Sequence, residues 1–369
     1  MTPIRLAVIG AGHLGRFHAK IAAQLDDVEL VAVCDPLKES RQRVSQEVGC
    51  RPVADFREVV GQIDAAVLAT PTFTHCDIGQ QLIEEGLSLL VEKPLASTVA
   101  EAEQLLRCAD RQGSILQVGH VERFNPAFTC VASKLKEPKY IEATRTSGYS
   151  FRSTDIGVVL DMMIHDLDII LALVDAPVTQ VDALGISVLG DHEDMASVRL
   201  TFATGCVAQL TASRVSYEMR RTMQVTTTSC FASIDFAKGQ ATLVAPREDV
   251  LKRELEFDEI TAEDVAYWKK HMFEELLVKQ VYHPPQVNAI EQEQRDLVRA
   301  IQQRGTPQVD GLAGRNAVAV AELILDQIAN HSWDGAGSKR CGPRAMPLSP
   351  MLYDPTSWGQ DVPQRRKAG

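Results

Sequence analysis

The sequence has no apolar run long enough to span a bilayer, no Cys-x-x-Cys pair and no excess of basic residues. Its 369 residues include 38 lysines and arginines against 49 aspartates and glutamates, a formal net charge of −11. Without a basic excess the chain lacks the electrostatic footprint of a nucleic-acid-binding protein. Without a long apolar run it lacks the signature of a membrane protein. We therefore expect neither nucleic acid nor membrane as a partner.

The eight cysteines are scattered and none has metal-finger spacing. They indicate buried or incidental thiols in a reducing compartment, and we expect no metal site. The N-terminus enters a predicted strand, Ile4–Ile9, at once, which leaves no room for a signal peptide. A cytoplasmic location is the expectation. With 45% hydrophobic residues, the chain is long enough for two domains, each with its own core.

The predicted first strand runs directly into a Gly-x-Gly-x-x-Gly motif made by Gly10, Gly12 and Gly15. In a dinucleotide fold, Gly10 allows the tight turn and Gly12 lets the backbone approach a pyrophosphate. Gly15 lets the following helix pack closely on the sheet. His13 and Leu14 open that helix, where free N–H groups face the phosphates. The motif alone is weak evidence, so its context decides.

A second predicted strand, Glu29–Cys34, ends in Asp35, twenty residues after the last glycine of the motif. A dinucleotide fold places there the acid that binds the adenosine ribose diol. The alternative is an Asp that merely ends a strand in a turn with Pro36. A carboxylate would repel a 2′-phosphate, so Asp35 favours NAD over NADP. Lys38 and Arg41 lie near enough to weaken that preference.

Short β-rich runs alternate with helical segments from residue 1 to about 120, the pattern of a parallel sheet covered on both faces. The further strands predicted in this region are Ala65–Ala69, Leu87–Val91 and Ile115–Val118. The helices predicted between the strands are Leu14–Leu25, Ser40–Val48, His75–Glu85 and Ala100–Arg111. We expect a Rossmann domain, doubly wound on a parallel sheet.

From about Lys139 the pattern changes to strands separated by hairpin-like turns, which predicts a mostly antiparallel sheet. The predicted strands are Tyr140–Thr146, Val178–Leu189, Ala196–Phe202, Cys206–Val215, Met223–Thr228 and Phe231–Phe236. The predicted helices are Gly157–Val174, Asn288–Arg304 and Arg315–Asn330, the last packing back on the first domain. The expected domains are residues 1–122, 123–331 and an extended or disordered tail, 332–369.

Three polar turns follow predicted strands of the first domain, at the edge where open α/β sheets bind ligands. They are Thr70-Pro71 with His75, Glu92-Lys93-Pro94, and the segment Gly119–Pro126. Each turn alone is best explained as ordinary surface structure. Together they indicate one site, in which the Lys93 amine reaches the nicotinamide or a substrate hydroxyl. The alternative for Lys93 is a surface lysine that happens to precede a proline.

The predicted helix Gly157–Val174 carries Asp161 and His165 at i and i+4, one turn apart beside an apolar stripe. At such a border a carboxylate can orient an imidazole and raise its basicity, which suits a general base. One alternative is a solvated helix flank that also includes Asp168. Another is a metal site, for which no open coordination pattern is visible.

Taken together, these motifs resemble the glucose–fructose oxidoreductase/inositol dehydrogenase (Gfo/Idh/MocA) family from Ile4 to about Asn330. The glycine loop resembles its nucleotide loop, and Thr70-Pro71 with His75 its next cofactor turn. Glu92-Lys93-Pro94 matches its lysine motif, with Glu92 beside the cofactor, and Asp161 with His165 its Asp-x-x-x-His helix. The resemblance implies a second domain on a large open sheet, whose free face forms a homodimer or homotetramer.

The resemblance also implies hydride transfer between a nicotinamide and a sugar or polyol carbon. In that scheme His165 takes the hydroxyl proton, Asp161 steadies His165, and Lys93 binds or polarises the reacting oxygen. The segments around Gly119–Pro126 and Arg152–Asp161 are similar to members that oxidise nucleotide sugars, such as UDP-N-acetylglucosamine at C3.

Within those segments Arg123, Asn125 and Arg152 are the candidate substrate residues. Guanidinium groups suit a diphosphate, although salt bridging is an equal alternative. Val287–Glu291 departs from the Glu-Pro-Leu-like helix start of such relatives. Two other functions stay open: a free-sugar or inositol dehydrogenase, and a non-catalytic dinucleotide sensor.

Overall fold

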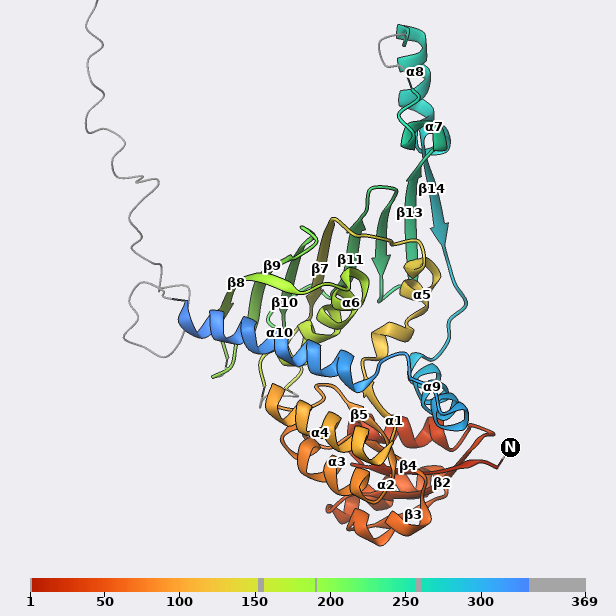
Figure 1. Cartoon of the computed structure of the whole chain (residues 1–369), viewed down its shortest axis with the longest axis vertical. Coiled ribbons are helices and arrows are strands. Elements are labelled where there is room, and N and C mark those ends of the chain that lie inside the picture. The colour runs from red at the N-terminus through yellow and green to blue at the C-terminus, as the bar shows by residue number, and fades with distance from the viewer. Residues whose placement is uncertain (1, 152–155, 190, 256–259, 332–369) are drawn as a thin grey trace, which may run out of the picture.

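Two sheets make up the protein, one parallel and one mostly antiparallel, arranged one after the other along the long axis of the molecule (Figure 1). The computed structural model describes residues 2–151, 156–189, 191–255 and 260–331. This architecture confirms the predicted fold class.

The first sheet has six parallel strands in the order β3-β2-β1-β4-β5-β6. The strands are β1 (Ile4–Ile9), β2 (Val28–Cys34), β3 (Arg51–Val53), β4 (Ala65–Leu68), β5 (Ser88–Glu92) and β6 (Leu116–Gly119). The strand order reverses between β1 and β4, the point where doubly wound sheets bind their ligands. Strand β3 was not predicted, because three residues that include a proline show no period.

Helices cover both faces of this sheet, as the alternating sequence pattern predicts. The helices are α1 (His13–Ala22), α2 (Lys38–Val48), α3 (His75–Glu84), α4 (Val99–Gln112), α9 (Ala289–Gln303) and α10 (Gly311–Asn330). One core joins α1, α2 and α9 to the sheet and includes Ala19, Val44 and Leu297. The other joins α3, α4 and α10 and includes Leu82 and Leu105. Each buried leucine stabilises the fold by about 1.5–3 kcal/mol.

The second sheet has eight strands in the order β14-β13-β12-β11-β7-β10-β9-β8. The strands are β7 (Tyr140–Thr146), β8 (Val178–Ile186), β9 (Met195–Phe202), β10 (Val207–Ser213), β11 (Arg220–Thr226), β12 (Phe231–Asp235), β13 (Gln240–Pro246) and β14 (Leu277–Tyr282). Neighbouring strands are antiparallel except β7 and β10, which run parallel.

One face of the second sheet is covered by helices of the same chain. These are α5 (Pro126–Ala132), α6 (Ile164–Val174) and α10, and they share a core with the inward side chains of the strands. Along β9 the buried positions Ala196, Val198, Leu200 and Phe202 alternate with Met195, Ser197, Arg199 and Thr201 on the other face. The apolar alternation is therefore satisfied by these helices.

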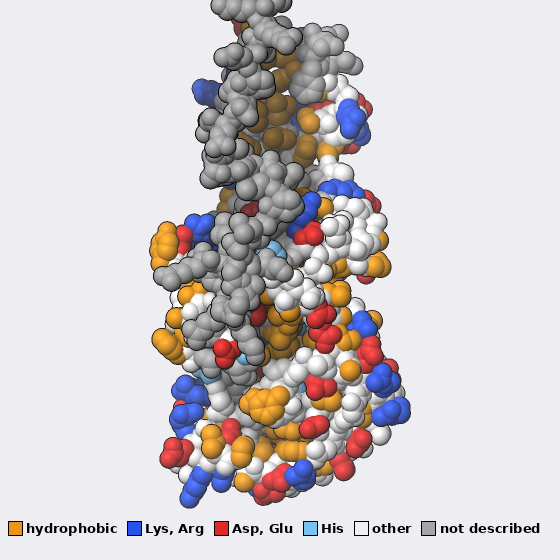
Figure 2. All heavy atoms as spheres, turned by 90° about the vertical axis from the view of Figure 1, so that its left-hand side faces the viewer, with side chains coloured by type: hydrophobic (Ala, Val, Ile, Leu, Met, Phe, Trp, Pro, Cys, Tyr) orange, Lys and Arg blue, Asp and Glu red, His pale blue; other side chains and the backbone are white. Residues whose placement is uncertain are grey.

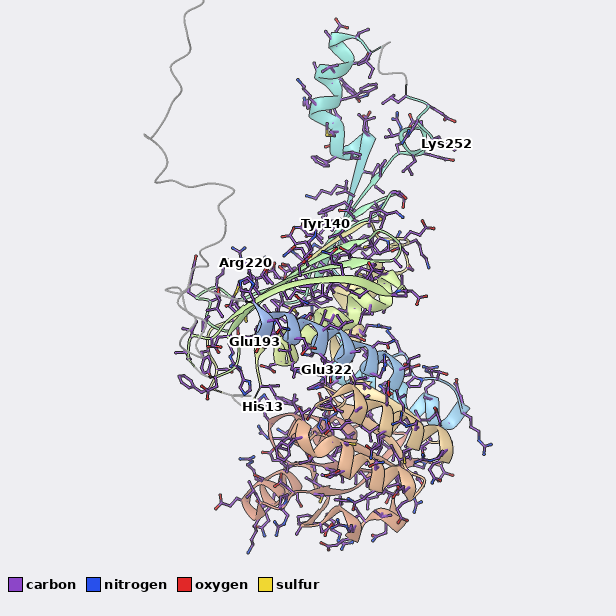
Figure 3. The ribbon with its side chains drawn as sticks, turned by 60° about the vertical axis from the view of Figure 1, so that its left-hand side comes forward. His13, Tyr140, Glu193, Arg220, Lys252 and Glu322 are labelled. Atoms are coloured by element: carbon purple, nitrogen blue, oxygen red, sulfur yellow. The ribbon has the colours of Figure 1, made fainter. Side chains whose placement is uncertain are left out.

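Helix α10 joins the two sheets. It packs against α4 and β6 on one side and against α6 and β8 on the other. Glu322, labelled on α10 in Figure 3, accepts a hydrogen bond of 2.7 Å from the backbone N–H of Val99, at the start of α4. Arg315 forms a 2.7 Å ion pair with Glu103, also on α4. These contacts fix the first sheet relative to the second.

Beyond the second sheet an arm extends from the β13–β14 hairpin and carries α7 (Glu248–Leu251) and α8 (Ala262–His271) at its far end (Figure 1). No described helix combines the length and apolar character that crossing a membrane requires. Figure 2 shows the left-hand side of the view in Figure 1, where acidic and basic side chains are interspersed around the lower half of the molecule. No continuous basic surface is seen there among the described residues.

Candidate active site

The glycine loop closes tightly over the carboxyl end of β1. Gly10 has a φ of +99°, and a Cβ at this residue would lie 2.4 Å from the carbonyl oxygen of Ala69. A Cβ on Gly15 would lie 1.8 Å from the carbonyl oxygen of Gly10. A side chain is thus excluded at both positions. Around Gly12 no atom lies within 4 Å of an added Cβ, so this side of the loop is open to a ligand.

The start of α1 presents uncapped backbone N–H groups to that open side. Gly12 is the N-cap residue, and it receives no side-chain hydrogen bond. Gly12, His13 and Leu14 are exposed. His13 lies on the side of the first sheet's layer that faces the second sheet (Figure 3). Uncapped N–H groups at a helix start bind phosphate through hydrogen bonds and the helix dipole.

Asp35 holds the end of β2 against the glycine loop. Its carboxylate accepts hydrogen bonds of 2.8 Å from the N–H of Ala11 and of 2.8 Å from the N–H of Leu37. The Arg41 guanidinium donates to the backbone carbonyls of Asp35 and Pro36. The half-buried carboxylate therefore places a negative charge beside the loop, at the position where the ribose end of a dinucleotide binds.

His75 ties two of the predicted turns together. Its Nε2 lies 2.9 Å from the carbonyl oxygen of Thr70 and its Nδ1 3.0 Å from that of Pro94. The ring is buried, and this burial lowers the pKa of His75. Because both ring nitrogens face backbone oxygens, the geometry makes His75 a brace between the two turns. The contact of His75 with the cofactor stays a prediction.

Lys93 lies at the centre of the cleft between the two sheets. Its side chain is 12% exposed, and its Nζ lies 2.5 Å from the carbonyl oxygen of Asp161 and 3.1 Å from Asp161 Oδ1. The cleft has a volume of about 260 Å³. Its lining residues are Leu14, Ala69, Thr70, Pro71, Thr72, Glu92, Lys93, Ile156 and Asp161. The predicted turns after β4 and β5 and the start of α1 thus line the same cavity.

The side chain of Glu92 belongs to a buried network behind Lys93. The Gln294 amide donates to His18 Nδ1 at 2.9 Å, so the His18 ring carries its proton on Nε2 and donates it to Glu92 Oε1 at 2.7 Å. Glu92 Oε2 also accepts the N–H of Lys93 at 3.2 Å. Glu92 therefore anchors the strand end. Because Glu92 also lines the cleft, its place beside the cofactor stays a prediction.

The same network contains the one group of described residues with the spacing to hold a cation. Ligand atoms of His18, Glu92 and Glu293 lie within 4.8 Å of one another. Both ring nitrogens of His18 are already hydrogen-bonded, as described above, and burial raises the pKa of Glu293 well above its usual range. A proton on Glu293 leaves Glu92 as the only charged carboxylate of these three residues. The group can therefore be buried without a metal ion.

The helix that carries Asp161 and His165 begins with a π-helical turn, Val159–Met163, and becomes α-helical only from Ile164. Asp161 lies within this π turn, and His165 lies in the α-helical part that follows. The Asp161 carboxylate pairs with Lys93, and the contacts of the described residues include none between Asp161 and His165. The structure thus pairs Asp161 with Lys93 instead of the predicted His165.

His165 is half-buried and neutral. Burial, together with the positive charges of Lys93 and Arg145, lowers the pKa of His165 well below its usual value. This is opposite to the expected rise in basicity, because the carboxylate that was to cause the rise faces Lys93. A neutral imidazole can still accept a proton, and it leaves a buried Nδ1 without a partner among the described residues.

Most of the predicted substrate residues form structural contacts within the chain. The Asn125 side chain caps α5 by accepting the N–H of Ala127 at 3.0 Å and donates to Glu122 at 2.9 Å. Arg123 lies 3.6 Å from Asp168 and donates to the carbonyl oxygen of Gln308. This favours the salt-bridge alternative for Arg123 and gives Asn125 a capping role. Arg152 lies outside the described residues.

A buried ion-pair cluster links α6 and the turn after β6 to the second sheet, and the sequence did not predict it. Arg145, on β7, forms a bidentate pair with Asp166, at 3.0 and 2.8 Å, and lies 2.8 Å from Glu122. All three side chains are buried. The cluster ties α6 and the turn after β6 to the second sheet. Its members are far apart in sequence and follow no common period, so only the tertiary structure brings them together.

Comparison with known proteins gives matches to both halves of the chain. A model described as "Oxidoreductase family, NAD-binding Rossmann fold" matches residues 4–120, and one described as "GFO/IDH/MocA C-terminal domain" matches residues 130–231. UDP-N-acetylglucosamine 3-dehydrogenase of Acidithiobacillus ferrooxidans is 37% identical over 64% of this chain and 75% of its own length. scyllo-Inositol 2-dehydrogenase (NAD(+)) of Bacillus subtilis is 34% identical over 58% of this chain and 68% of its own length.

A solved structure of the Acidithiobacillus ferrooxidans enzyme is also similar in fold. It superposes with a TM-score of 0.78 at 30% sequence identity and covers 89% of this chain and 98% of that chain. The likeness therefore spans both sheets and the cleft between them.

Proposed function

The chain belongs to the Gfo/Idh/MocA oxidoreductase family, and from this premise we propose that it oxidises a sugar hydroxyl with NAD in the cleft beside Lys93. The observation that carries the proposal is that the open helix start after Gly12 and the Lys93 ammonium meet at one cavity, while His165 lies four residues after the cavity-lining Asp161. The first binds a diphosphate, the second polarises an oxygen, and the third accepts a proton.

In the proposed reaction, NAD would be held along the carboxyl edge of the first sheet. Its diphosphate would be held by Gly10, Gly12, His13, Leu14 and Gly15. The rest of the cofactor would be flanked by Asp35, Thr70, Pro71 and Thr72. NAD supplies a carbon that accepts hydride when it is bound. Lys93 donates a hydrogen bond to the substrate oxygen, and Asp161 fixes the Lys93 ammonium in place, 3.1 Å from its carboxylate. His165 takes the hydroxyl proton.

We propose NAD over NADP because Asp35 presents a carboxylate where the ribose binds. Both carboxylate oxygens already bond backbone N–H groups, so the charge cannot turn away from the loop. A 2′-phosphate placed there would meet a fixed negative charge at short range.

For the substrate we propose a nucleotide sugar, with UDP-N-acetylglucosamine oxidised at C3 as the leading member. The support is the similarity to a UDP-N-acetylglucosamine 3-dehydrogenase over three quarters of that protein's length. The similarity to an inositol 2-dehydrogenase supports a second candidate, a free polyol. The Asn125 side chain is engaged in capping α5, and Arg123 is held beside Asp168 with Nη1 buried, so neither residue favours one candidate over the other.

The test is an assay of the purified protein with NAD and a panel of UDP-sugars, free sugars and inositols, monitored by NADH absorbance. Turnover on UDP-N-acetylglucosamine supports the leading candidate, and turnover on inositol alone supports the second. NAD binding without turnover on any member would indicate a non-catalytic sensor. The absence of NAD binding would overturn the whole proposal.

Two substitutions test the assigned roles. We expect Lys93→Met and His165→Ala each to lower kcat by about 10²–10⁴-fold, the usual contribution of a positioned acid or base. NAD affinity should stay within about threefold, because neither residue contacts the diphosphate loop. Lys134→Met, at an exposed lysine away from the cleft, is the control and should retain full activity.

A further inference from the structure

Four side chains next to the cleft have buried polar atoms without a hydrogen-bond partner among the described residues. The atoms are Nδ1 of His165, both ring nitrogens of His120, Oδ2 of Asp168 and Nη1 of Arg123. His120 is only 1% exposed and Asp168 only 2%. Buried polar groups are rarely left unpaired, because each one costs about 1–3 kcal/mol. A concentration of five such atoms therefore points to enclosed water and a function.

The four side chains form one continuous patch between the turn after β6 and helix α6. The rings of His120 and His165 are 6.3 Å apart between centroids and almost perpendicular, at 87°. Asp168 lies three residues after His165 on α6, hence on the neighbouring part of the helix surface. Arg123 Nη1 lies 3.6 Å from Asp168 Oδ1. The chain of polar groups thus runs from the cleft to Arg123.

A general base at His165 needs a partner for the nitrogen that does not face the substrate. When neutral His165 accepts a proton at Nε2, its own hydrogen must be on Nδ1, which is buried. Asp161 does not serve as that partner, since it pairs with Lys93. The ring centroids of His120 and His165 are 6.3 Å apart, a separation that one bridging water can span.

Resting on the proposed dehydrogenase function, we propose that His120 is the positioning residue for His165. Through one enclosed water, His120 accepts the hydrogen bond of His165 Nδ1–H and so keeps Nε2 free for the substrate hydroxyl. Arg123 and Asp168 hold the far side of His120 by their charges.

The proton of the substrate hydroxyl is transferred along the same groups, His165, the enclosed water and His120. The C–H bond of the substrate breaks, and its electron pair goes with the hydride to the nicotinamide. The O–H bond breaks, its proton goes to His165 Nε2, and its electron pair completes the C=O bond. The Nδ1 proton then passes to the water, and a water proton passes to His120.

The charges around the two rings favour this direction of transfer. His165 faces the cations Lys93, Arg145 and Arg221 as well as His120. His120 faces two carboxylates, Asp168 and Glu92, besides Lys93 and Arg123. Burial lowers the pKa of both rings. The transferred proton therefore moves from a ring whose strongest charged neighbours are cations to one that also has carboxylate neighbours.

The test compares His120→Phe, which keeps a ring but removes both nitrogens, with His120→Gln, which keeps a polar end. His283→Phe, at an exposed histidine outside the cleft, is the matched control. We expect His120→Phe to lower kcat at least about tenfold, to leave the KM for NAD unchanged and to move the acidic limb of the kcat–pH profile to lower pH. His120→Gln should restore part of the loss. An unchanged limb with an equal loss at every pH would overturn the proposal.

A double variant separates positioning from packing. In a His165→Ala background we expect His120→Phe to cost less than about twofold, because His120 acts only through His165. A full, additive loss would show a structural role instead and would overturn the proposal.

Nitrogen NMR of histidine-labelled protein makes the inference independent of substrate. We expect His165 as the Nδ1–H tautomer in the wild type, with its nitrogen signals shifted by His120→Gln and unaffected by His283→Phe. A wild type that turns over sugars while His120→Phe is fully active would sink this inference alone. A wild type that turns over nothing but shows the coupled signals would sink the proposed function alone.

Discussion

At the scale of single residues, Asp35 sets the charge at the ribose end of the proposed NAD groove. Its two carboxylate oxygens bond the N–H groups of Ala11 and Leu37, so the residue both shapes the loop and repels a phosphate. Arg41 lies alongside and bonds the backbone carbonyls of Asp35 and Pro36. One substitution at Asp35 can thus replace the repulsion of a 2′-phosphate by attraction to the nearby cations.

We predict that Asp35→Ser shifts the cofactor preference toward NADP. The serine hydroxyl removes the negative charge and still accepts a backbone N–H, while Arg41 and Lys38 remain close enough to bind a 2′-phosphate. The ratio of kcat/KM for NAD to that for NADP should fall at least about tenfold. The measurement is steady-state kinetics with both cofactors. Glu39→Ser, at an exposed acid on α2, is the control, and an unchanged ratio for Asp35→Ser would refute the assignment.

Asp35 and Asp161 show which residue roles the sequence can reveal. Asp35 follows from local order, since a strand, a glycine loop, a helix and a second strand fix its place. Asp161 was expected to pair with His165, four residues further along the helix, whereas the structure pairs Asp161 with Lys93. Because Lys93 lies 68 residues earlier in the sequence, this pairing depends on tertiary contact.

At the scale of elements, helix α9 brings a buried acid to the back of the active site. Glu293 is fully buried, and both of its carboxylate oxygens lack a partner among the described residues. Burial, with the charges of Glu92 and Asp296, raises the pKa of Glu293 well above its usual range. The folded protein therefore binds this proton more tightly than the unfolded chain does.

This gives a pH dependence of stability with a definite sign. The contribution of Glu293 is fully present below the unfolded pKa, about 4.3, and is lost as pH rises toward the raised folded value. Glu293→Gln, which is always neutral, should lack this loss. We predict that the free energy of unfolding of Glu293→Gln minus that of the wild type increases between pH 5 and pH 8 in urea titrations. Glu291→Gln, at a half-buried acid in the first turn of α9 that pairs with Arg295, should show no such trend, and parallel curves for Glu293→Gln would contradict the prediction.

Elements with a strong period were predictable, and elements defined by tertiary contact were not. Strands β1 and β7 have the bounds expected from their apolar patterns, Ile4–Ile9 and Tyr140–Thr146. Strands β13 and β14 were not predicted, because their exposed ends break the alternation and the arm between them separates the pair by thirty residues of chain. Helix α5 is only seven residues long and shows little period.

At the scale of the whole molecule, the arm is the part that the described residues of the chain leave uncovered. Helix α8 buries none of its residues against the rest of the described chain. A helix of ten residues is marginal in water without packing. The arm also exposes large apolar side chains, Leu251, Val265, Tyr267, Phe273 and Val281. Strand β14, at the base of the arm, is the edge of its sheet and offers unpaired backbone groups.

We therefore predict that a second copy of the chain covers the arm, which would give the homodimer or homotetramer expected from the sequence. In light scattering after size exclusion, the wild type should have two or four times the chain mass of 40.5 kDa. Phe273→Glu should lower that mass, because it places a charge in the covered surface. Leu312→Glu is the matched control, since both side chains are 55% exposed and Leu312 lies on α10 away from the arm. A wild type at the mass of a single chain, or a Phe273→Glu variant with unchanged mass, would show that the arm has another partner.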